Sequence, residues 1–345
     1  MSVITTQGDL LKQHDVDAVV NTVNCVGVMG KGIALQFKKK WPDNFKAYLA
    51  ACESKVVKPG KMFIYNSGAL ARPKYIINFP TKKHWKGKSQ IEYIQDGLID
   101  LVEQIKALNI NSIAVPPLGC GNGGLDWKEV KPLIINAFSY IPDIEVRLFE
   151  PEGTPIAKDM VVNTKCPRMT PGRAAILKVL DTYRELNYGL TKIEVQKLAY
   201  FLQEAGEPLS LQFVKHQYGP YADKLRHVLD KMDGHFIHGV GDGVVESEIA
   251  PDNKALKEAE MFINSMEHHD LHAHVSRVAE LIEGFQSPFG MELLATVHWV
   301  ATNEQADTLE KAVQAVKVWN ERKKRLMKKE HIEIAWDRLV ELSWI

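Results

Sequence analysis

Two glycine-rich segments of this chain combine amides with turns that suit a phosphate ligand. The first reads DAVVNTVNCVGVMGKG over residues 17–32: an apolar run, two asparagines, then glycines leading into a helical pattern. Glycines permit positive φ and close backbone approach, and a helix start presents free N–H groups to an anion. The second segment, SIAVPPLGCGNGG over residues 112–124, has the same order. Two such turns predict a clamp for one pyrophosphate, although a tight strand-to-helix turn also explains each one alone.

Single polar residues near these segments have both ligand-binding and structural interpretations. Asn21 and Asn24 could bond ribose hydroxyls through their amides, but Asn is also a common turn residue. Asp9 could accept from an adenine amine or cap a short helical turn. Cys120 could be a nucleophile, although a cysteine inside a glycine turn is more often a small packing residue.

The densest basic stretch of the first half is TKKHWKGK, residues 81–88. From charge alone it is typical of a solvated loop or of general phosphate affinity. Because it follows an apolar run, Lys82 would lie at the end of a strand.

The elements that must position these residues are short β-branched runs alternating with helical patterns. Strands are predicted at residues 17–21, 61–65, 74–78, 112–116 and 145–149, and helices at 33–40, 90–108 and 127–138. This alternation predicts an α/β fold with a mixed or mostly parallel sheet and helices on its faces. Such sheets place ligands on loops beyond the carboxyl ends of their strands.

Composition and length favour a two-domain protein of the cytosol. The chain has 345 residues, is 45% hydrophobic and has a net charge of +0. Residues 1–150 hold 19 Lys+Arg and 14 Asp+Glu, so 24 and 29 of the 43 of each kind remain. Neither a leader pattern nor a run of eighteen apolar residues is apparent. Four cysteines without CxxC spacing argue against structural zinc and against an oxidising compartment, and no metal site is predicted.

Several of these motifs together resemble the macrodomain family over about residues 1–150. They are GDL at 8–10, VNTVN at 20–24, GVMGKGIA at 27–34 and PLGCG at 117–121. The segments MGKGIA and NFPTK, the latter at 78–82, are most similar to the branch that contains terminal ADP-ribose glycohydrolases and DarG-type antitoxins. The resemblance implies a three-layer α/β/α macrodomain with a mixed central sheet, and ADP-ribose as substrate moiety or product, with no cofactor.

The resemblance also implies a set of site residues. Asp9 would lie at adenine, Asn21 and Asn24 near the distal ribose, and both glycine loops at the diphosphate. The ligand-binding residues it implies are Asp9, Leu10, Asn21, Asn24, Gly27, Val28, Met29, Gly30, Lys31, Gly32, Thr81, Pro117, Leu118, Gly119, Cys120, Gly121, Asn122 and Gly123.

Lys82 takes the position of a lysine that is essential in the glycohydrolase branch. It would act at the anomeric carbon of the ADP-ribosyl group, as nucleophile or as proton donor. Related glycohydrolases carry an acidic residue where this chain has Gly123. The carboxylate that would help break down a lysine adduct is therefore missing, which leaves the covalent route open to question.

Three functions fit the resemblance and the residues. The favoured one is an antitoxin that removes ADP-ribose from DNA bases, acting on single-stranded ADP-ribosylated DNA, and that also binds a cognate DarT-like toxin. The alternatives are a protein-ADP-ribose hydrolase or an ADP-ribose-binding module, joined to a winged-helix DNA-binding regulator. No membrane contact is expected.

The second half changes character after a proline-rich linker at residues 151–172. Helices are predicted at 173–186, 191–205 and 222–232, with Thr191 and Glu194 forming a capping box. Residues 191–202 and 216–221 resemble the helical, winged-helix domains of some antitoxins, which implies a toxin-binding domain at 173–345. Helical packing, with a turn at Gly219, is the alternative explanation.

Charge in the second half suggests how a toxin could be bound. Residues 230–283 hold 12 Asp+Glu but 4 Lys+Arg. An acidic surface could occupy a basic DNA-binding groove by imitating phosphates, or could simply be solvated. The lysine-rich residues 323–329 argue against mimicry over the whole domain.

Overall fold

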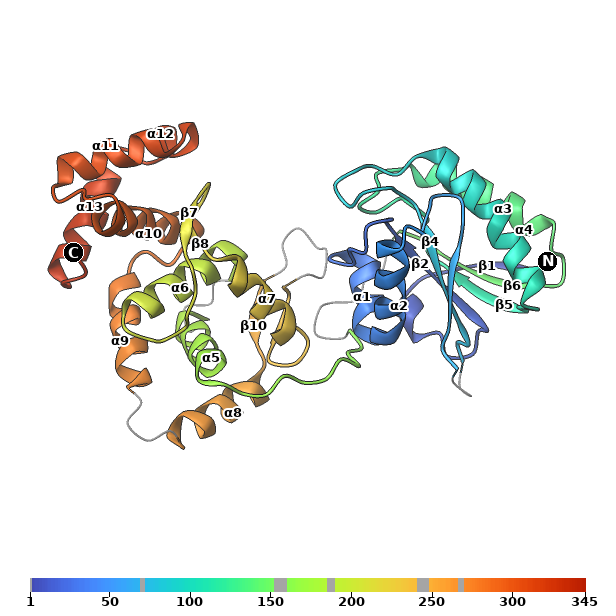
Figure 1. The fold of residues 1–345 in the computed structure, drawn as a ribbon, viewed down its shortest axis with the longest axis horizontal. Helices are drawn as coiled ribbons and strands as arrows, with labels where there is room; N and C mark the ends of the chain where they lie inside the picture. The colour runs from blue at the N-terminus through green and yellow to red at the C-terminus, as the bar shows by residue number, and fades with distance from the viewer. Residues whose placement is uncertain (1, 69–71, 152–159, 185–189, 241–247, 266–269) are drawn as a thin grey trace. The chain divides into compact units, whose positions relative to one another are not determined.

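A computed structural model describes residues 2–68, 72–151, 160–184, 190–240, 248–265 and 270–345 (Figure 1). Internal contacts divide the described residues into a first unit ending at Lys165 and a second unit beginning at Cys166. This boundary falls inside the expected linker, of which residues 152–159 lie outside the described residues. No helix among the described residues is long and apolar enough to span a membrane.

The first unit is built on a six-stranded mixed sheet with the order β1-β6-β5-β2-β4-β3. All neighbouring strands pair in parallel except β3 and β4. The strands are β1 (Ser2–Thr6), β2 (Ala18–Val23), β3 (Phe63–Asn66), β4 (Tyr75–Pro80), β5 (Ser112–Val115) and β6 (Glu145–Phe149). Because β2, β4 and β5 are parallel and adjacent, the loops that follow them leave the same edge of the sheet.

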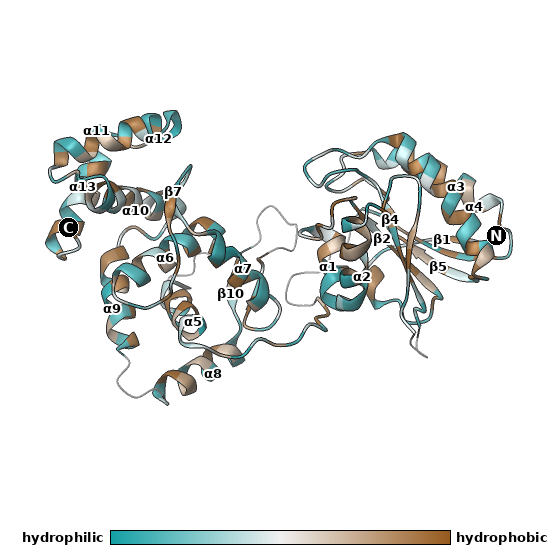
Figure 2. Cartoon of the chain, viewed as in Figure 1, coloured by the Kyte–Doolittle hydropathy of each residue, from teal (hydrophilic) through white to brown (hydrophobic). Residues whose placement is uncertain are grey.

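Helices cover both faces of this sheet, and Figure 2 shows their mixed apolar and polar surfaces. On one face α3 (Ile91–Ala107) and α4 (Trp127–Ser139) bury Leu98 and Ile134 against the strands. On the other, α1 (Gly32–Lys40) and α2 (Pro42–Glu53) supply Phe37 and Tyr48 to two smaller cores. The predicted three-layer arrangement with a mixed sheet is therefore confirmed.

Two elements of the first unit were absent from the sequence prediction. Strand β1 is an edge strand whose Ile4 is exposed, so it lacks the apolar run of a buried strand. Helix α2 begins directly after α1, with Pro42 in its first turn. Proline fits the first turn because that N–H needs no partner within the helix. The remaining strands and helices fall within a few residues of their predicted positions.

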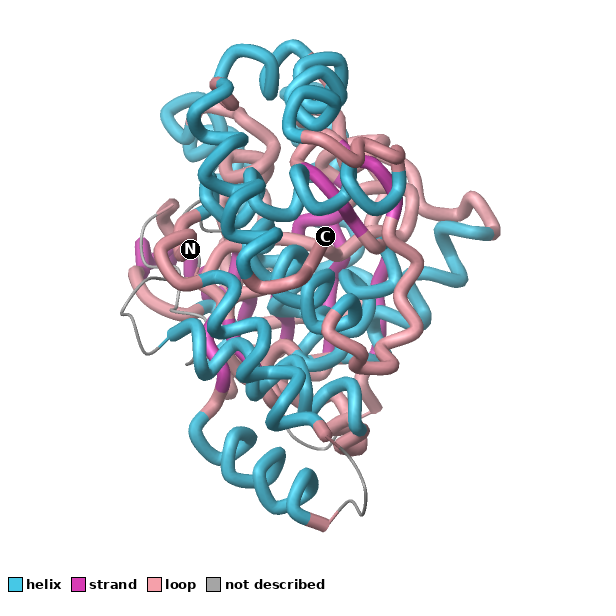
Figure 3. The backbone as a smooth tube through the Cα atoms, turned by 90° about the vertical axis from the view of Figure 1, so that its left-hand side faces the viewer, coloured by secondary structure: helices cyan, strands magenta, loops and turns pink. Residues whose placement is uncertain are grey.

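The second unit is mainly helical, as predicted (Figures 1 and 3). Its helices are α5 (Pro171–Arg184), α6 (Lys192–Glu204), α7 (Asp223–Met232), α8 (Asn253–Asn264), α9 (Leu271–Ile282), α10 (Pro288–Asn303), α11 (Leu309–Trp319), α12 (Glu321–Leu326) and α13 (Lys329–Glu341). Two hairpins accompany them, β7 (Val214–His216) with β8 (Gly219–Tyr221), and β9 (Ile237–His238) with β10 (Ala250–Pro251). The backbone N–H of Thr191 donates to Glu194 (2.7 Å), as the predicted capping box requires. The winged-helix assignment stays a prediction.

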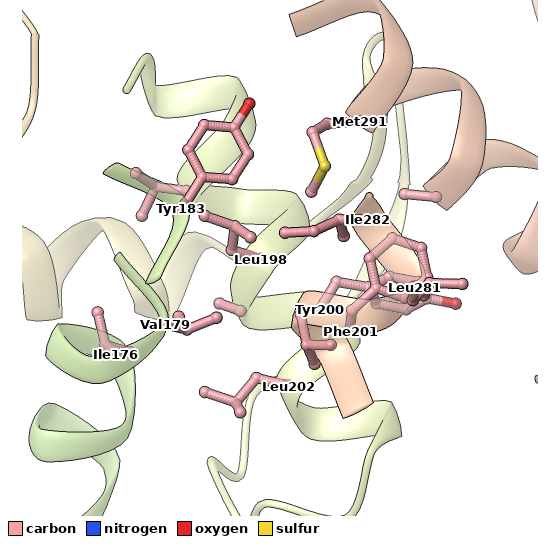
Figure 4. Close-up of a cluster of buried hydrophobic side chains, with 14 of the residues drawn as sticks. Ile176, Val179, Tyr183, Leu198, Tyr200, Phe201, Leu202, Leu281, Ile282 and Met291 are labelled. Carbon is pink, nitrogen blue, oxygen red and sulfur yellow. The ribbon is translucent and has the colours of Figure 1, made fainter. Parts of the chain in front are cut away.

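One large apolar core holds the second unit together. Helices α5, α6, α9 and α10 contribute the side chains drawn in Figure 4, which include Ile176, Val179, Tyr183, Leu198, Tyr200, Phe201, Leu202, Leu281, Ile282 and Met291. Helix α6 is buried over most of its surface, since residues 194–202 are all buried. α6 therefore lies in the centre of the unit, although its buried residues include the polar Glu194, Gln196 and Lys197.

A buried group of charges links three helices and the first hairpin of the second unit. Lys323 Nζ donates to Glu292 Oε1 (2.6 Å) and to Thr296 Oγ1 (3.0 Å). Lys197 Nζ donates to the carbonyl of Pro220 (2.7 Å), and all three charged side chains are at most 1% exposed. Burial lowers the pKa of Lys197 to about 7. These contacts tie α6, α10 and α12 to the turn at Gly219, which has a φ of 91°.

Candidate active site

The loop after β2 is held in shape by the side chain of Asn24. Its Oδ1 accepts from the backbone N–H of Val26 (3.0 Å) and Val28 (3.3 Å), and its Nδ2 donates to the Val28 carbonyl (2.5 Å). Tyr48 of α2 donates its hydroxyl to the Asn24 carbonyl (2.7 Å). Asn24 is 5% exposed, so its amide organises the loop that was predicted to bind a diphosphate. This observation favours a turn-forming role, and a ribose contact remains a prediction.

Glycines in this loop meet real conformational demands. Gly27 has a φ of 78°, and a Cβ added there would lie 2.6 Å from Leu49 Cδ1 of α2. Gly32, the first residue of α1, has a φ of 57°. Val28, Gly30 and Lys31 are exposed while Met29 is buried, so the loop turns alternate residues outward. The exposed backbone just before α1 has the geometry in which a helix N-terminus receives an anion.

Asn21 belongs to a buried chain of three amides. Its Nδ2 donates to Oδ1 of Asn78 (3.0 Å), the residue opposite it on β4, and Asn78 Nδ2 donates to Oδ1 of Asn44 on α2 (2.8 Å). Asn21 and Asn78 are both 0% exposed. The Oδ1 of Asn21 is buried and has no hydrogen-bond partner among the residues that the structure describes. A buried acceptor without a partner costs free energy, so Asn21 Oδ1, at the end of the row of three amides, is available to accept from a ligand.

The second glycine loop, after β5, packs tightly against Ser89. Gly119 has a φ of 73°, and a Cβ there would lie 2.9 Å from Leu125 Cδ1. At Gly123 a Cβ would lie 2.2 Å from the Gly119 carbonyl and 2.3 Å from Ser89 Oγ. Ser89 N–H also donates to the Gly123 carbonyl (3.0 Å). The loop therefore has no room for any side chain at the position where related glycohydrolases carry an acid.

Lys82 stands between the loops, two residues after β4. Its Nζ donates to the carbonyls of Asn122 (3.0 Å) and Gly87 (3.4 Å). Partial burial lowers the pKa of Lys82 from its ordinary value. Among the described residues no carboxylate forms an ion pair with it, so the amine is held by neutral backbone acceptors that a ligand can replace.

Backbone contacts bring the three loops together. Thr81 N–H donates to the Val23 carbonyl (2.9 Å), and Cys25 N–H donates to the Lys83 carbonyl (3.1 Å), so the residues after β4 run beside those after β2. A Cβ at Gly32 would lie 3.1 Å from Asn122 Nδ2 of the second loop. The structure thus joins both predicted glycine loops and Lys82 at one edge of the sheet.

Asp9 and Leu10 belong to a short 3-10 helix, η1 (Leu10–Lys12). Asp9 Oδ1 accepts from Leu11 N–H (2.8 Å), which is the N-cap interpretation of this carboxylate. Leu10 is buried in the small core beside α1. A carboxylate has a second oxygen, so capping leaves an acceptor for an adenine amine, and that contact stays a prediction.

Two cysteines near the loops are poor nucleophiles. Cys120 of the second loop and Cys25 of the first are half-buried, and burial raises the pKa of each thiol to about 11. A thiol must ionise to attack, and these remain protonated at neutral pH. The packing interpretation of Cys120 is favoured.

Sequence reasoning assigned no role to four residues that shape the site. They are Asn44, Tyr48, Asn78 and Ser89. Asn78 carried a visible signal, because it is polar within the otherwise apolar run YIINFP. The other three lie in helices or loops whose sequence gives no sign of the contact.

Comparisons with known proteins find relatives of the first unit. A family model described as Macro domain matches residues 20–134. The solved structure titled "Macrodomain of Mycobacterium tuberculosis DarG" is 54% identical, covers 44% of this chain and 99% of that one, and gives a TM-score of 0.43.

Relatives match nearly the whole chain. A protein of Thermus aquaticus named "DNA ADP-ribosyl glycohydrolase" is 48% identical over 334 residues, covering 97% of this chain and 92% of its own. A protein of Mycobacterium tuberculosis with the same name is 44% identical, covering 96% of this chain and 97% of its own. Identity at this level over both units shows that the chain is a macrodomain protein of the DNA ADP-ribosyl glycohydrolase (DarG) family.

Proposed function

We propose that this protein releases ADP-ribose from modified DNA bases, with Lys82 as its catalytic residue. The supporting observation is the position of Lys82, whose amine lies beside the second glycine loop and whose pKa is lowered by burial. The two loops hold the diphosphate, and this fixes the anomeric carbon of the distal ribose relative to the lysine.

Of the two roles open to Lys82, the local geometry favours proton donation. The bond between the anomeric carbon and the base breaks and the base leaves with a proton from Lys82. Water then adds to the carbon and gives up one proton, which restores the Lys82 ammonium. A lowered pKa makes the ammonium a stronger acid. The covalent route needs help to break down the adduct, and Gly123 leaves no room for a carboxylate there.

The test is to replace Lys82 with alanine and to follow both binding and turnover. We expect Lys82→Ala to bind ADP-ribose normally and to lose release from an ADP-ribosylated oligonucleotide by roughly a hundredfold or more, the usual scale of an acid catalyst. Lys74→Ala, just before the other end of β4, is the matched control. Full turnover by Lys82→Ala would refute the assignment. Faster release by the wild type from modified protein than from DNA would favour the protein hydrolase instead.

We further propose that the second unit binds and neutralises a cognate DarT-like toxin. A Thermosipho africanus protein named "DNA ADP-ribosyl transferase-DNA ADP-ribosyl glycohydrolase fusion protein" is 37% identical over 145 residues. The match covers 38% of this chain, and a fusion of opposing activities supports physical coupling of the two. The assignment of the contact to the second unit rests on the resemblance of residues 191–202 and 216–221 to antitoxin domains.

Acidic mimicry of DNA receives only partial support from the side chains. In the acidic stretch, Glu260 pairs with Lys178 (2.7 Å) and Asp230 with Arg226 (3.7 Å). Lys323 of the basic stretch is buried on Glu292 and therefore does not oppose mimicry at the surface.

Toxin binding is tested by co-expressing the toxin with the full chain carrying Lys82→Ala. The expected result is a stable complex and protection of cells without hydrolysis. A folded Lys82→Ala protein that forms no complex would refute the second role.

A further inference from the structure

An aromatic pair, His84 and the exposed Trp85, lies two and three residues after Lys82. Trp85 is 48% exposed, and its ring lies 5.5 Å from that of His84 with an interplanar angle of 30°. The other tryptophans of the first unit, Trp41 and Trp127, pack partly buried against its cores. An exposed tryptophan near a candidate catalytic residue can bind part of the substrate.

The segment that carries this pair, residues 81–88, is fixed at both ends and in its middle. At its start Cys25 N–H donates to the Lys83 carbonyl (3.1 Å), and just beyond its end Ser89 N–H donates to the Gly123 carbonyl (3.0 Å). Gly87 N–H donates to the His84 carbonyl (3.0 Å), which closes a turn under the aromatic pair. The Gly87 carbonyl accepts from Lys82 Nζ (3.4 Å), so this turn lies against the lysine amine.

The charge of the 81–88 segment is uniformly positive. It holds Lys82, Lys83, Lys86 and Lys88 and no acidic residue. Among the described residues, none of these lysines forms an ion pair with a carboxylate. Lys86 lies 5.0 Å from the centroid of the Trp85 ring, so a cation and an aromatic face are presented together.

We propose that the 81–88 segment is a subsite for the unpaired DNA strand next to the modified base, with Trp85 and His84 stacking on a neighbouring base. Lys86 and Lys88 contact the phosphates of that strand. The inference rests on the proposed function, because Lys82 acts at the bond that joins ADP-ribose to its base. The strand must therefore leave the site past the residues that follow Lys82.

The combination of groups matches unpaired DNA better than a duplex or a peptide. An aromatic face can stack only on a base that is not already stacked on both sides, as in single strands. Lysines at the flanks of an aromatic platform suit a regularly spaced phosphate backbone. A duplex would hide the base faces and would use the lysines alone.

The main test measures binding of an unmodified, fluorescently labelled single-stranded oligonucleotide of about ten nucleotides to the full chain. We expect Trp85→Ala to weaken binding roughly tenfold, because stacking on one base has that effect on affinity. Trp85→Phe should restore most of the affinity. Tyr140→Ala, which removes an aromatic side chain 67% exposed at the end of α4, should change nothing.

Kinetics on two substrates separate a subsite from a structural role. With an ADP-ribosylated oligonucleotide, Trp85→Ala should raise KM roughly tenfold with kcat little changed. With an ADP-ribosylated mononucleoside, which has no flanking strand, Trp85→Ala should match the wild type. Equal loss on both substrates, or unchanged oligonucleotide binding, would overturn the proposal. A loss confined to ADP-ribosylated protein would overturn it in favour of a peptide.

A salt titration tests the phosphate contacts separately. The double variant Lys86→Ala and Lys88→Ala should lower the slope of log affinity against log salt by about 1.4, because each single-strand phosphate contributes about 0.7. If the slope of log affinity against log salt is unchanged, Lys86 and Lys88 do not contact the phosphates. If the wild type binds the oligonucleotide through Trp85 but releases no ADP-ribose from DNA, the proposed function fails and the subsite stands.

Discussion

The two units place lysine in opposite environments. Lys82 of the first unit is partly buried at the edge of a sheet, and its amine bonds two backbone carbonyls. Lys323 of the second unit is 0% exposed and bonds the carboxylate of Glu292. A ligand can compete for the first amine but cannot reach the second. The same residue type therefore stays accessible to a ligand in one unit and holds helices together in the other.

Asparagines and glycines also have different roles in the two units. In the first unit Asn24, Gly27 and Gly123 shape loops at the ends of parallel strands, where a ligand can approach. In the second unit Gly219 makes a hairpin turn against Lys197 and Thr296 within the core. Asparagines and positive-φ glycines thus indicate a ligand site only when they lie at an edge of the sheet that a ligand can reach.

The largest effect is expected from a substitution that disrupts the buried charge group of Lys323, Glu292 and Lys197. Glu292→Ala leaves Lys323 and Arg322, which also bonds Glu292 (2.6 Å), without their carboxylate. We expect a loss of about 3–5 kcal/mol in the free energy of unfolding of the second unit. Chemical denaturation followed for each unit would measure it, with Glu321→Ala, which is 91% exposed, as the control. A loss below about 1 kcal/mol would mean that water reaches the cluster.

A smaller effect tests the closed second loop of the first unit. Gly123→Ala should destabilise that unit by about 1–3 kcal/mol, because the added methyl group collides with the Gly119 carbonyl. Gly121→Ala is the matched control for stability, since a Cβ there meets nothing within 4 Å. Thermal unfolding of both variants gives the comparison, and equal stability would show that the loop can open.

The pH dependence of stability should differ when Lys197 is removed. Its folded pKa, about 7, is below the unfolded value, so the unfolded chain holds an extra proton between about pH 7 and pH 10. The free energy of unfolding should therefore fall as the pH falls through this window. Lys197→Met lacks this contribution. Buried tyrosines such as Tyr183, whose pKa is raised, have the opposite effect on the free energy of unfolding. They are present in both the wild type and Lys197→Met, so their effect cancels when the two free energies are subtracted. If the difference in free energy of unfolding between the wild type and Lys197→Met is constant across this pH range, Lys197 is not neutral in the folded protein.

The smallest expected effect comes from removing the second unit altogether. A fragment ending at Lys165 should release ADP-ribose from a modified mononucleoside within about twofold of the full chain, since all the loops lie in the first unit. Ending it at Glu150 instead removes Asn163, which bonds the carbonyls of Lys39 and Lys40 (2.9 Å each). A folded but inactive 1–165 fragment would show that the second unit completes the site.

Local patterns allowed most strands and helices of the first unit, the first three helices of the second and both glycine loops to be predicted, whereas α8 to α13 and the strands of the second unit were not predicted. The strand over residues 112–116 is visible because a short apolar, β-branched run is a feature of a few neighbouring residues, and β5 forms there. The same holds for α3, whose apolar spacing is unmistakable. Edge strand β1 and the helix α2 were missed because their environment, and not their own pattern, makes them ordered.

The sequence by itself determined which residues could form the site, because turns, strand ends and a basic segment after a strand are encoded locally. Only the tertiary structure decided how they are used. The contact of Lys82 with Asn122 spans 40 residues, and that of Asn21 with Asn78 spans 57. Such contacts depend on which strands become neighbours in the sheet. Sequence spacing says nothing of that choice, since it is made by packing across the whole unit.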